Sequence, residues 1–202
     1  MAEISALFFD IGGVLLSNAW DRDRRLKACQ RFGLDPTRFE ARHVRLVDSF
    51  ERGHLSLEDY LREVLDTDAS TLSQKDFREF FFGQSAPHPS ALESVRKLAR
   101  SGRYTMAALS NESKELNEFR IERFGLREFF SLFFSSCYTG WRKPEPEAFR
   151  VALGVTQRAP GECLFLDDRP ENVTAASRLG MQTLLVRNPE MLGEELATAG
   201  VV

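Results

Sequence analysis

The chain has 202 residues, of which 43% are apolar and 28% are charged, and its formal net charge is −3. This composition is that of an ordinary globular protein and fits one domain, or one domain with a modest insertion. The slight acidic excess argues against a nucleic-acid-binding protein, which usually carries a basic patch or stripe. No uncharged apolar run approaches the roughly 20 residues that cross a bilayer, and the first apolar stretch contains Asp10, which is not typical of a signal peptide.

The cysteines point to a reducing environment. Cys29, Cys137 and Cys163 are widely spaced, odd in number and form no CxxC pair, which favours free thiols over disulfides. We therefore expect a cytoplasmic protein with no membrane and no nucleic acid among its partners. The sequence leaves a monomer and a homodimer both open.

Five short apolar runs predict buried β-strands, and helical patterns separate most of them. The strands are expected at residues 4–9, 104–109, 132–136, 163–166 and 182–186. The helices of this part are expected at residues 89–100, 112–124, 145–153 and 170–179. We expect Ser110 or Asn111 to be the N-cap of the second of these helices. Strands that alternate with helices predict an α/β fold, a doubly wound parallel sheet with helices on both faces.

Residues 18–86 interrupt this alternation, because they show helical spacing only. Apolar stripes such as Leu57, Tyr60, Leu61 and Val64 recur at helical intervals. We interpret residues 18–86 as a small helical cap of about four helices, inserted after the first strand. Residues 1–17 and 87–202 would then form the sheet domain.

Distinctive polar residues follow the predicted strands. Asp10 follows the first, Ser110 and Asn111 the second, and Asp167 and Asp168 the fourth. Because ligands of parallel sheets bind at the carboxyl ends of the strands, these residues are expected to meet in one crevice. Each of them alone fits a turn or a helix cap, but their joint placement favours a site.

The chemistry of this set suits phosphoryl transfer. Several carboxylates suit Mg²⁺, and without a cation they would repel one another. Lys143, in the loop after the third strand, would offset this repulsion together with Mg²⁺ and attract a phosphoryl group. A carboxylate can then attack phosphorus, and Ser110 and Asn111 can donate hydrogen bonds to phosphoryl oxygens.

Four segments together resemble the haloacid dehalogenase-like (HAD) hydrolase superfamily. They are the segments 9–15 (FDIGGVL), 109–111 (LSN), 142–149 (RKPEPEAF) and 165–173 (FLDDRPENV). The resemblance is to the subgroup IA-like members with a helical C1-type cap after the first strand of a Rossmann-like core. It includes sugar-phosphate phosphatases, such as those acting on glucose 1-phosphate, and the phosphatase domain of soluble epoxide hydrolase.

The resemblance implies a role for each matching residue. Asp10 is the expected nucleophile and a Mg²⁺ ligand, with Asp168 and the backbone carbonyl of Gly12 as further ligands. Lys143 is expected to neutralise Asp10 and the transferring group. The remaining residues are expected to bind phosphate (Ser110, Asn111) or to support Lys143 and the loop after the fourth strand (Asp167, Asn172).

Gly12 departs from the family pattern. Phosphatases of the superfamily usually have a second Asp two residues after the nucleophile, which protonates the leaving group and activates water. Glycine has no side chain for this task, and general acid catalysis typically contributes about 10²–10⁴-fold. We therefore predict a slow or leaving-group-selective phosphatase of small phosphorylated substrates, in which Gly12→Asp raises the turnover of esters with poor leaving groups.

Residues of the cap and of the loop around Lys143 would select the substrate. The candidates for contacts in the pocket are Trp20 and Arg142, and further candidates are Asn18, Asp21, Arg22, His43, Arg45 and Trp141. Trp20 fits an interface residue equally well, and His43 fits a packing residue better. Two alternatives to a phosphatase stay open: a metal-independent 2-haloacid dehalogenase, which also lacks the second Asp, and a degenerate scaffold that binds a phosphate ligand or a protein.

Overall fold

The structure is a computed structural model that describes residues 2–65 and 73–201. One sheet of five parallel strands lies at its centre, in the order β3–β2–β1–β4–β5. The strands are β1 (Ala6–Phe9), β2 (Thr105–Ser110), β3 (Leu132–Ser135), β4 (Cys163–Asp167) and β5 (Gln182–Leu185). Every strand lies within two residues of its predicted bounds, so the predicted parallel sheet is confirmed.

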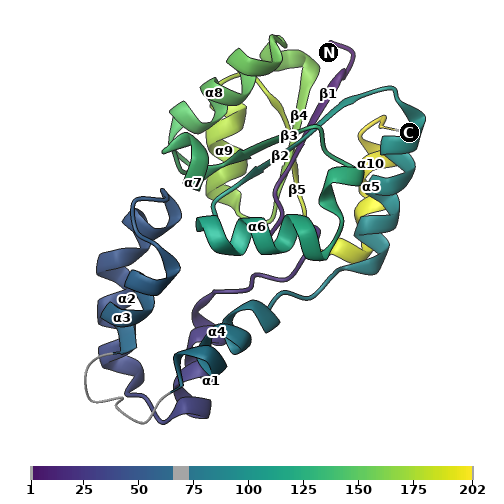
Figure 1. Cartoon of the computed structure of the whole chain (residues 1–202). Helices are drawn as coiled ribbons and strands as arrows, with labels where there is room; N and C mark the ends of the chain where they lie inside the picture. The colour runs from purple at the N-terminus through teal and green to yellow at the C-terminus, as the bar shows by residue number, and fades with distance from the viewer. Residues whose placement is uncertain (1, 66–72, 202) are drawn as a thin grey trace.

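Helices cover both faces of the sheet because successive side chains of the central strand point to opposite sides. Leu7 and Phe9 belong to a core shared with α5 (Pro89–Ser101) and α10 (Leu192–Thr198). Ala6 and Phe8 belong to a second core, shared with α8 (Pro146–Thr156) and α9 (Pro170–Arg178). Figure 1 shows these two helix layers on either side of β1. The fold class predicted from the sequence, a doubly wound α/β sheet, is confirmed.

The predicted start of one helix is wrong. The helix expected from residue 112 is α6 (Lys114–Arg123), and its N-cap is Ser113 rather than Ser110 or Asn111. Strand β2 continues through Ser110, so the chain needs residues 111–113 to turn from strand to helix. The sequence also did not predict α7 (Ser136–Thr139), which is too short to show a helical period. Three short 3₁₀ helices complete the sheet domain: η1 (Leu126–Glu128), η2 (Pro160–Glu162) and η3 (Pro189–Met191).

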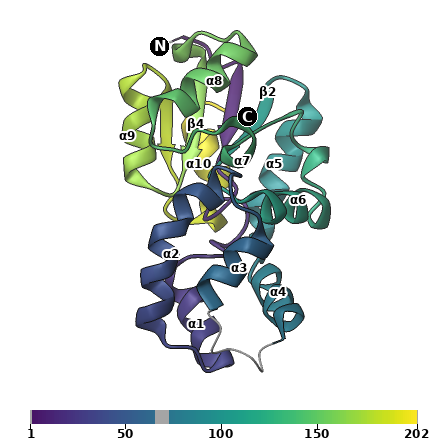
Figure 2. The same cartoon turned by 60° about the vertical axis from the view of Figure 1, so that its left-hand side comes forward.

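Four α-helices lie among the described residues between β1 and α5. They are α1 (Arg22–Phe32), α2 (Pro36–Glu51), α3 (Leu57–Leu65) and α4 (Gln74–Gly83). They enclose a separate apolar core that includes Phe39, Tyr60, Phe77 and Phe81. Figure 2 shows this helical group beyond one end of the sheet. We refer to it below as the cap, and the exact division at residues 18 and 86 stays a prediction.

Two segments of the chain connect the cap to the sheet, one at Ser17 and one at residues 84–86, and hydrogen bonds join them. Ser17 Oγ donates to the carbonyl of Gln84 (2.8 Å) and accepts from the N–H of Ala86 (2.9 Å). The Ser17 N–H also donates to the carbonyl of Ala86 (2.8 Å). Within the described residues, no helix is long and apolar enough to cross a membrane.

Candidate active site

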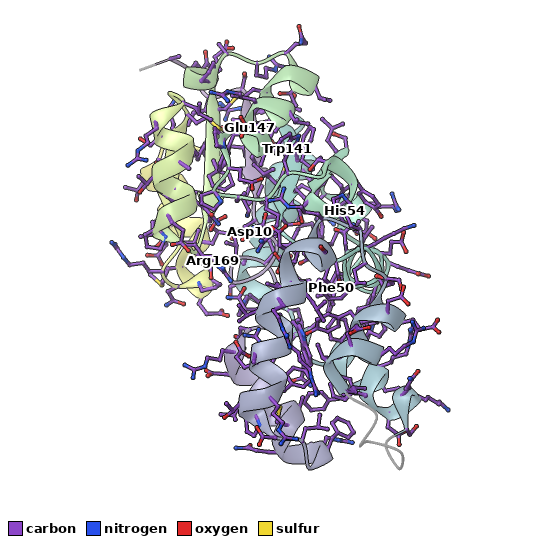
Figure 3. All side chains as sticks on the ribbon, turned by 90° about the vertical axis from the view of Figure 1, so that its left-hand side faces the viewer. Asp10, Phe50, His54, Trp141, Glu147 and Arg169 are labelled. Atoms are coloured by element: carbon purple, nitrogen blue, oxygen red, sulfur yellow. The ribbon has the colours of Figure 1, made fainter. Side chains whose placement is uncertain are left out.

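Three carboxylates meet at the end of the sheet that faces the cap. Asp10 follows β1, and Asp167 ends the neighbouring β4, where Phe9 pairs with Leu166. Asp168 is the next residue, and one oxygen from each of Asp10, Asp167 and Asp168 lies within 4.8 Å of the others. Figure 3 shows Asp10 between the sheet and the cap helices. The parallel topology thus brings together residues that are almost 160 positions apart in sequence.

Lys143 lies between two of these carboxylates. Its Nζ is 3.0 Å from Asp10 Oδ1 and 2.6 Å from Asp167 Oδ2. Burial alone would lower the pKa of Lys143, but the two neighbouring carboxylates outweigh it and raise the pKa, so the side chain stays charged. The side chain of Asn111 fixes the backbone of Lys143, because it accepts from the Lys143 N–H (2.8 Å) and donates to the Lys143 carbonyl (2.8 Å).

Burial is the main influence on Asp10. It raises the pKa of Asp10 from 3.8 to about 8; Lys143 opposes the shift, whereas Asp167 and Asp168 add to it. One lysine cannot neutralise three carboxylates, so a further cation at this place would favour the ionised form of Asp10. Only the ionised form is a nucleophile.

Asp167 and Asp168 differ in what they contact. Besides Lys143, Asp167 accepts from Asn172 Nδ2 (3.0 Å to each oxygen) and from the N–H of Arg169 (2.8 Å). Asp168 uses one oxygen, Oδ2, to accept from Asn18 Nδ2 (3.0 Å). Its other oxygen, Oδ1, is buried and has no hydrogen-bond partner in the described part of the chain. Asp168 therefore has an oxygen available for a cation, whereas Asp167 is occupied with positioning contacts.

The turn after β1 leaves room for little more than glycine. A Cβ at Gly13, where φ is +74°, would lie 2.2 Å from Asp168 Oδ2. A Cβ at Gly12 would lie 2.8 Å from Asn18 Oδ1 and 3.6 Å from Arg120 Nη1. Asn18 and Arg120 therefore lie where the side chain of residue 12 would begin, and an Asp at this position would have to displace Asn18.

The two residues expected to bind phosphate are placed differently. Ser110 is buried at the end of β2, and its Oγ has no hydrogen-bond partner among the described residues. The side-chain amide of Asn111 is taken up by the backbone of Lys143, as described above. Ser110 thus has a hydroxyl available for a ligand, and the phosphate contact of Asn111 stays a prediction that its side-chain geometry does not favour.

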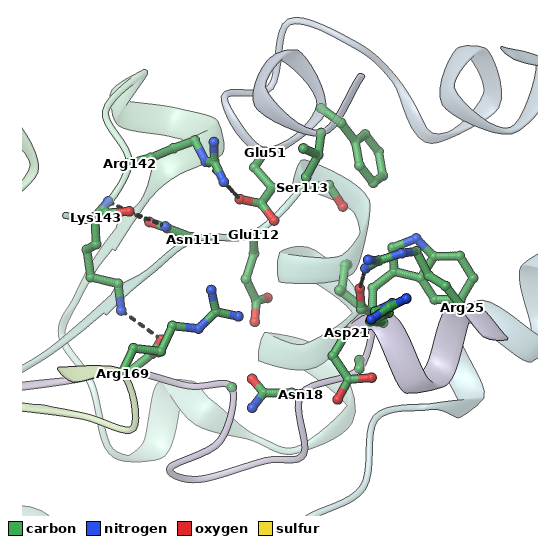
Figure 4. A pocket seen from close by; sticks show the side chains of 18 of the residues that line it. Asn18, Asp21, Arg25, Glu51, Asn111, Glu112, Ser113, Arg142, Lys143 and Arg169 are labelled. Carbon is green, nitrogen blue, oxygen red and sulfur yellow. Dashed lines mark hydrogen bonds and ion pairs between the residues drawn. The ribbon is translucent and has the colours of Figure 1, made fainter. Parts of the chain in front are cut away.

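A cavity of about 310 Å³ lies between Asp10 and the cap. Asp10, Gly12 and Lys143 form its floor, and Trp20, His43, Phe50 and Phe81 line it from the cap side. Of the other predicted pocket residues, Asn18, Asp21, Arg22 and Arg142 line this cavity, and Arg45 and Trp141 are exposed outside its lining. Figure 4 shows Lys143, Glu112 and Arg169 pointing into it from the sheet domain.

Trp20 and His43 belong to one hydrogen-bonded group in the cap. Trp20 Nε1 donates to the hydroxyl of Tyr60 (2.9 Å), and that hydroxyl is 2.8 Å from His43 Nδ1. Burial and then Arg25 lower the pKa of His43 to about 4, so the imidazole is neutral at pH 7. A neutral ring that accepts the Tyr60 proton at Nδ1 carries its own proton on Nε2. His43 therefore packs in the cap core and also lines the cavity.

Arg142 lines the cavity, but its guanidinium is paired with carboxylates of the cap. Its guanidinium pairs with Glu51 Oε2 (2.7 Å) and Asp48 Oδ1 (3.0 Å), both on α2. A second arginine, Arg52 of the cap, contacts the loop that carries Lys143: it pairs with Glu145 and donates to the carbonyl of Gly140 (2.6 Å). These reciprocal pairs hold the end of α2 against the loop that carries Lys143, and they leave the predicted grip of Arg142 on the substrate without support.

Sequence reasoning missed several residues that line the cavity, and the charged ones among them on the sheet-domain side are Glu112, Arg120 and Arg169. Glu112 and Arg169 directly follow predicted site residues, which was a usable signal. Arg120 lies inside α6, and nothing in its sequence surroundings distinguishes it from a solvated helix residue.

The motifs and the site define a hydrolase of the haloacid dehalogenase-like class. Residues 4–180 match the haloacid dehalogenase-like hydrolase family, and the chain belongs to this family. It resembles Flavin mononucleotide hydrolase 1 of Arabidopsis thaliana, with 36% identity over 80 residues, which are 40% of this chain and 33% of that protein. It also resembles phosphoserine phosphatase of Thermus thermophilus, with 31% identity over 107 residues, which are 52% of this chain and 43% of that protein. The matched segments thus span less than half the length of these two relatives.

Solved structures share the fold. A HAD family enzyme from Bacteroides thetaiotaomicron, solved as a magnesium complex, has a TM-score of 0.80 and 22% identity, with 92% of this chain and 94% of that chain covered. The same enzyme was also solved with magnesium and inorganic phosphate, at a TM-score of 0.74.

Proposed function

We propose that the chain hydrolyses small phosphate monoesters with Mg²⁺, through an aspartyl-phosphate on Asp10. The observation that carries the proposal is the pairing of buried Asp10 with Lys143 at the floor of a cavity. Asp168, in the same carboxylate cluster, and Ser110, at the end of β2, each add a buried oxygen without a hydrogen-bond partner among the described residues. The relatives named as an FMN hydrolase and a phosphoserine phosphatase support it. Sugar phosphates are the substrate class that we expect.

The donor set fits Mg²⁺. Asp10 and Asp168 would hold the ion, with the backbone carbonyl of Gly12, and the buried free oxygen of Asp168 is the observation that supports this fit. When bound, the ion would stabilise the ionised form of Asp10 and the negative charge of the phosphoryl group.

The residues of the chain would carry the reaction itself. The carboxylate of Asp10 attacks phosphorus, and the bond to the leaving oxygen breaks. Lys143 stabilises the charge on the equatorial oxygens, and Ser110 donates its hydroxyl to one of them. Water then attacks phosphorus and releases Asp10 and inorganic phosphate. Asp167, Asn172 and Asn111 keep Lys143 in place throughout.

The test is a panel of phosphate monoesters with Mg²⁺, run with wild type, Asp10→Asn and a control. Asp76→Asn makes the same chemical change at an exposed position of α4 and should retain full activity. Asp10→Asn and EDTA should both abolish phosphate release. Release that survives Asp10→Asn would exclude the proposal. Release of halide from 2-haloacids that is unchanged in EDTA would indicate the dehalogenase alternative. Tight phosphate binding with no turnover would indicate the scaffold alternative.

A further inference from the structure

A buried ion pair lies beside the position of the missing acid. Arg120 Nη1, which is 3.6 Å from the place of a Gly12 Cβ, pairs with Glu112 Oε1. Both side chains are buried, with 3% and 4% of their side-chain surface exposed. Arg120 is fixed by two further contacts, from Nη2 to the carbonyl of Ser17 (2.7 Å) and from Nε to Ser85 Oγ (3.1 Å). The same guanidinium nitrogen therefore contacts the Glu112 carboxyl and lies beside the place of a side chain at residue 12.

One carboxyl oxygen of Glu112 has no hydrogen-bond partner among the described residues. Oε1 accepts from Arg120, whereas Oε2 is buried and has no hydrogen-bond partner among the described residues. The backbone of Glu112 is fixed by Ser136, whose Oγ accepts from the Glu112 N–H (3.0 Å). Glu112 lines the same cavity as Asp10 and Lys143 (Figure 4). A buried polar atom without a partner is costly, so a hydrogen bond from Oε2 to a ligand would offset this cost.

The surroundings of Glu112 raise the pKa of its carboxyl above the usual value for a glutamate. Burial raises its pKa, while Arg120 and Lys143 lower the pKa without cancelling the effect of burial. Glu51 of the cap and Cys137 of α7 also interact electrostatically with Glu112. An anionic ester in the cavity would add a further negative charge nearby and would favour the protonated form more.

We propose that Glu112 is the proton donor to the leaving group, in place of the acid that Gly12 cannot supply. This inference rests on the proposed function of Asp10. In the first step, Asp10 attacks phosphorus, the bond to the leaving oxygen breaks, and the Glu112 proton moves to that oxygen to give the alcohol. In the second step, the Glu112 carboxylate takes a proton from water as the water oxygen attacks phosphorus. The bond between phosphorus and Asp10 then breaks, so both carboxyl groups return to their starting states.

This assignment changes the expected selectivity. Gly12 alone would leave the enzyme dependent on good leaving groups, whereas a proton from Glu112 helps most when the leaving alkoxide is a poor one. The wild-type enzyme should therefore depend only weakly on the pKa of the leaving alcohol, and the strong dependence should appear when Glu112 is changed.

The experiment compares wild type, Glu112→Gln and Glu122→Gln on phosphate monoesters of alcohols and phenols that span a wide range of pKa. Gln retains the shape of the side chain and an oxygen for Arg120 but carries no transferable carboxyl proton. Glu122 is exposed on α6, the helix that begins two residues after Glu112, so Glu122→Gln is the control for the chemical change and should behave as wild type. Glu112→Gln should lose about 10²–10⁴-fold in kcat/KM on alkyl esters. It should lose less than about tenfold on nitrophenyl phosphate, whose leaving group needs little protonation.

An equal loss on both kinds of ester, or no loss on alkyl esters, would overturn the assignment. Either result leaves the role of Asp10 standing, because that role is tested by Asp10→Asn and by EDTA. If Glu112→Gln fails to fold, as judged by its thermal unfolding, Glu112→Asp serves instead. It retains the carboxyl but withdraws it by one methylene, and a loss on alkyl esters that exceeds the loss on nitrophenyl phosphate is again the expected result. Equal losses would again contradict the proposal.

Discussion

Lys143 should contribute strongly to stability, and Lys143→Met tests this directly. Its Nζ contacts Asp10 and Asp167 at 3.0 and 2.6 Å, and the three side chains are 1%, 11% and 0% exposed. Removing one partner of a buried ion pair typically costs about 3–5 kcal/mol, because the remaining charge stays buried without compensation. Met retains most of the volume of Lys, so the loss reports mainly on charge. We expect the free energy of unfolding to fall by about 3–5 kcal/mol at pH 8 without metal.

The stability loss caused by Lys143→Met should depend on pH, and the pKa of Asp10 gives the direction. The folded-state pKa of Asp10 is raised to about 8, so its favourable contribution to folding is complete below its unfolded value of 3.8 and is lost as the pH rises through about 8. At pH 5 Asp10 is largely neutral in the folded protein and needs less compensation from Lys143. The deficit of Lys143→Met relative to wild type should therefore grow between pH 5 and pH 9.

Guanidinium denaturation at several pH values, in EDTA, measures this deficit. Lys97→Met, at an exposed position of α5, is the matched control and should stay within about 0.5 kcal/mol of wild type. Adding Asp167→Asn to Lys143→Met should recover part of the loss, because one uncompensated charge is removed. A deficit below about 1 kcal/mol at pH 8, or one that shrinks as the pH rises, would refute the charge-compensation argument.

Three further predictions follow from single contacts. Asp168→Asn should abolish the Mg²⁺-induced rise in melting temperature and the Mg²⁺ heat in calorimetry; an unchanged heat would remove Asp168 from the ligand set. His43 is buried, and its pKa is lowered to about 4, whereas in the unfolded chain the same side chain takes up a proton below about pH 6.5. The neutral ring of His43 therefore contributes to folding stability above pH 6.5, and this contribution is lost as the pH falls through about 4. Between pH 7 and pH 4 the wild type should thus lose about 3 kcal/mol more unfolding free energy than His43→Gln, and equal losses would contradict burial of the neutral ring. Arg52→Gln removes the pairing with Glu145, so amide hydrogens of residues 139–145 should exchange faster than in wild type, and unchanged exchange would show that this pair does not hold the loop.

Strand positions and strand-end residues were predictable because they depend on local signals. Apolar runs such as 163–166 end at polar residues, and parallel pairing then fixes which ends are neighbours. The neighbourhood of Asp10, Asp167 and Lys143 therefore followed from topology alone. The start of α6 was predicted wrongly because a Ser or Asn after a strand fits a helix cap and a connecting loop equally well.

Contacts that cross from the cap to the sheet domain could not be predicted in the same way. The hydrogen bond of Asn18 to Asp168 and the contact of Arg120 to Ser85 depend on the angle at which the cap meets the sheet. No periodicity in the sequence encodes this angle. A buried Arg on a helix is also invisible to a pattern that places charged residues at the surface.

The loop of residues 140–145 contacts both the cap and the nucleophile. At its two ends, Gly140 and Glu145 accept hydrogen bonds from Arg52 of the cap. At its centre, Lys143 is held by Asn111 at the backbone and by Asp10 at the side chain. An open cap would release the first set of contacts but not the second. Lys143 would therefore stay in place if the cap moved, and cap movement would act on the substrate and on water rather than on the nucleophile.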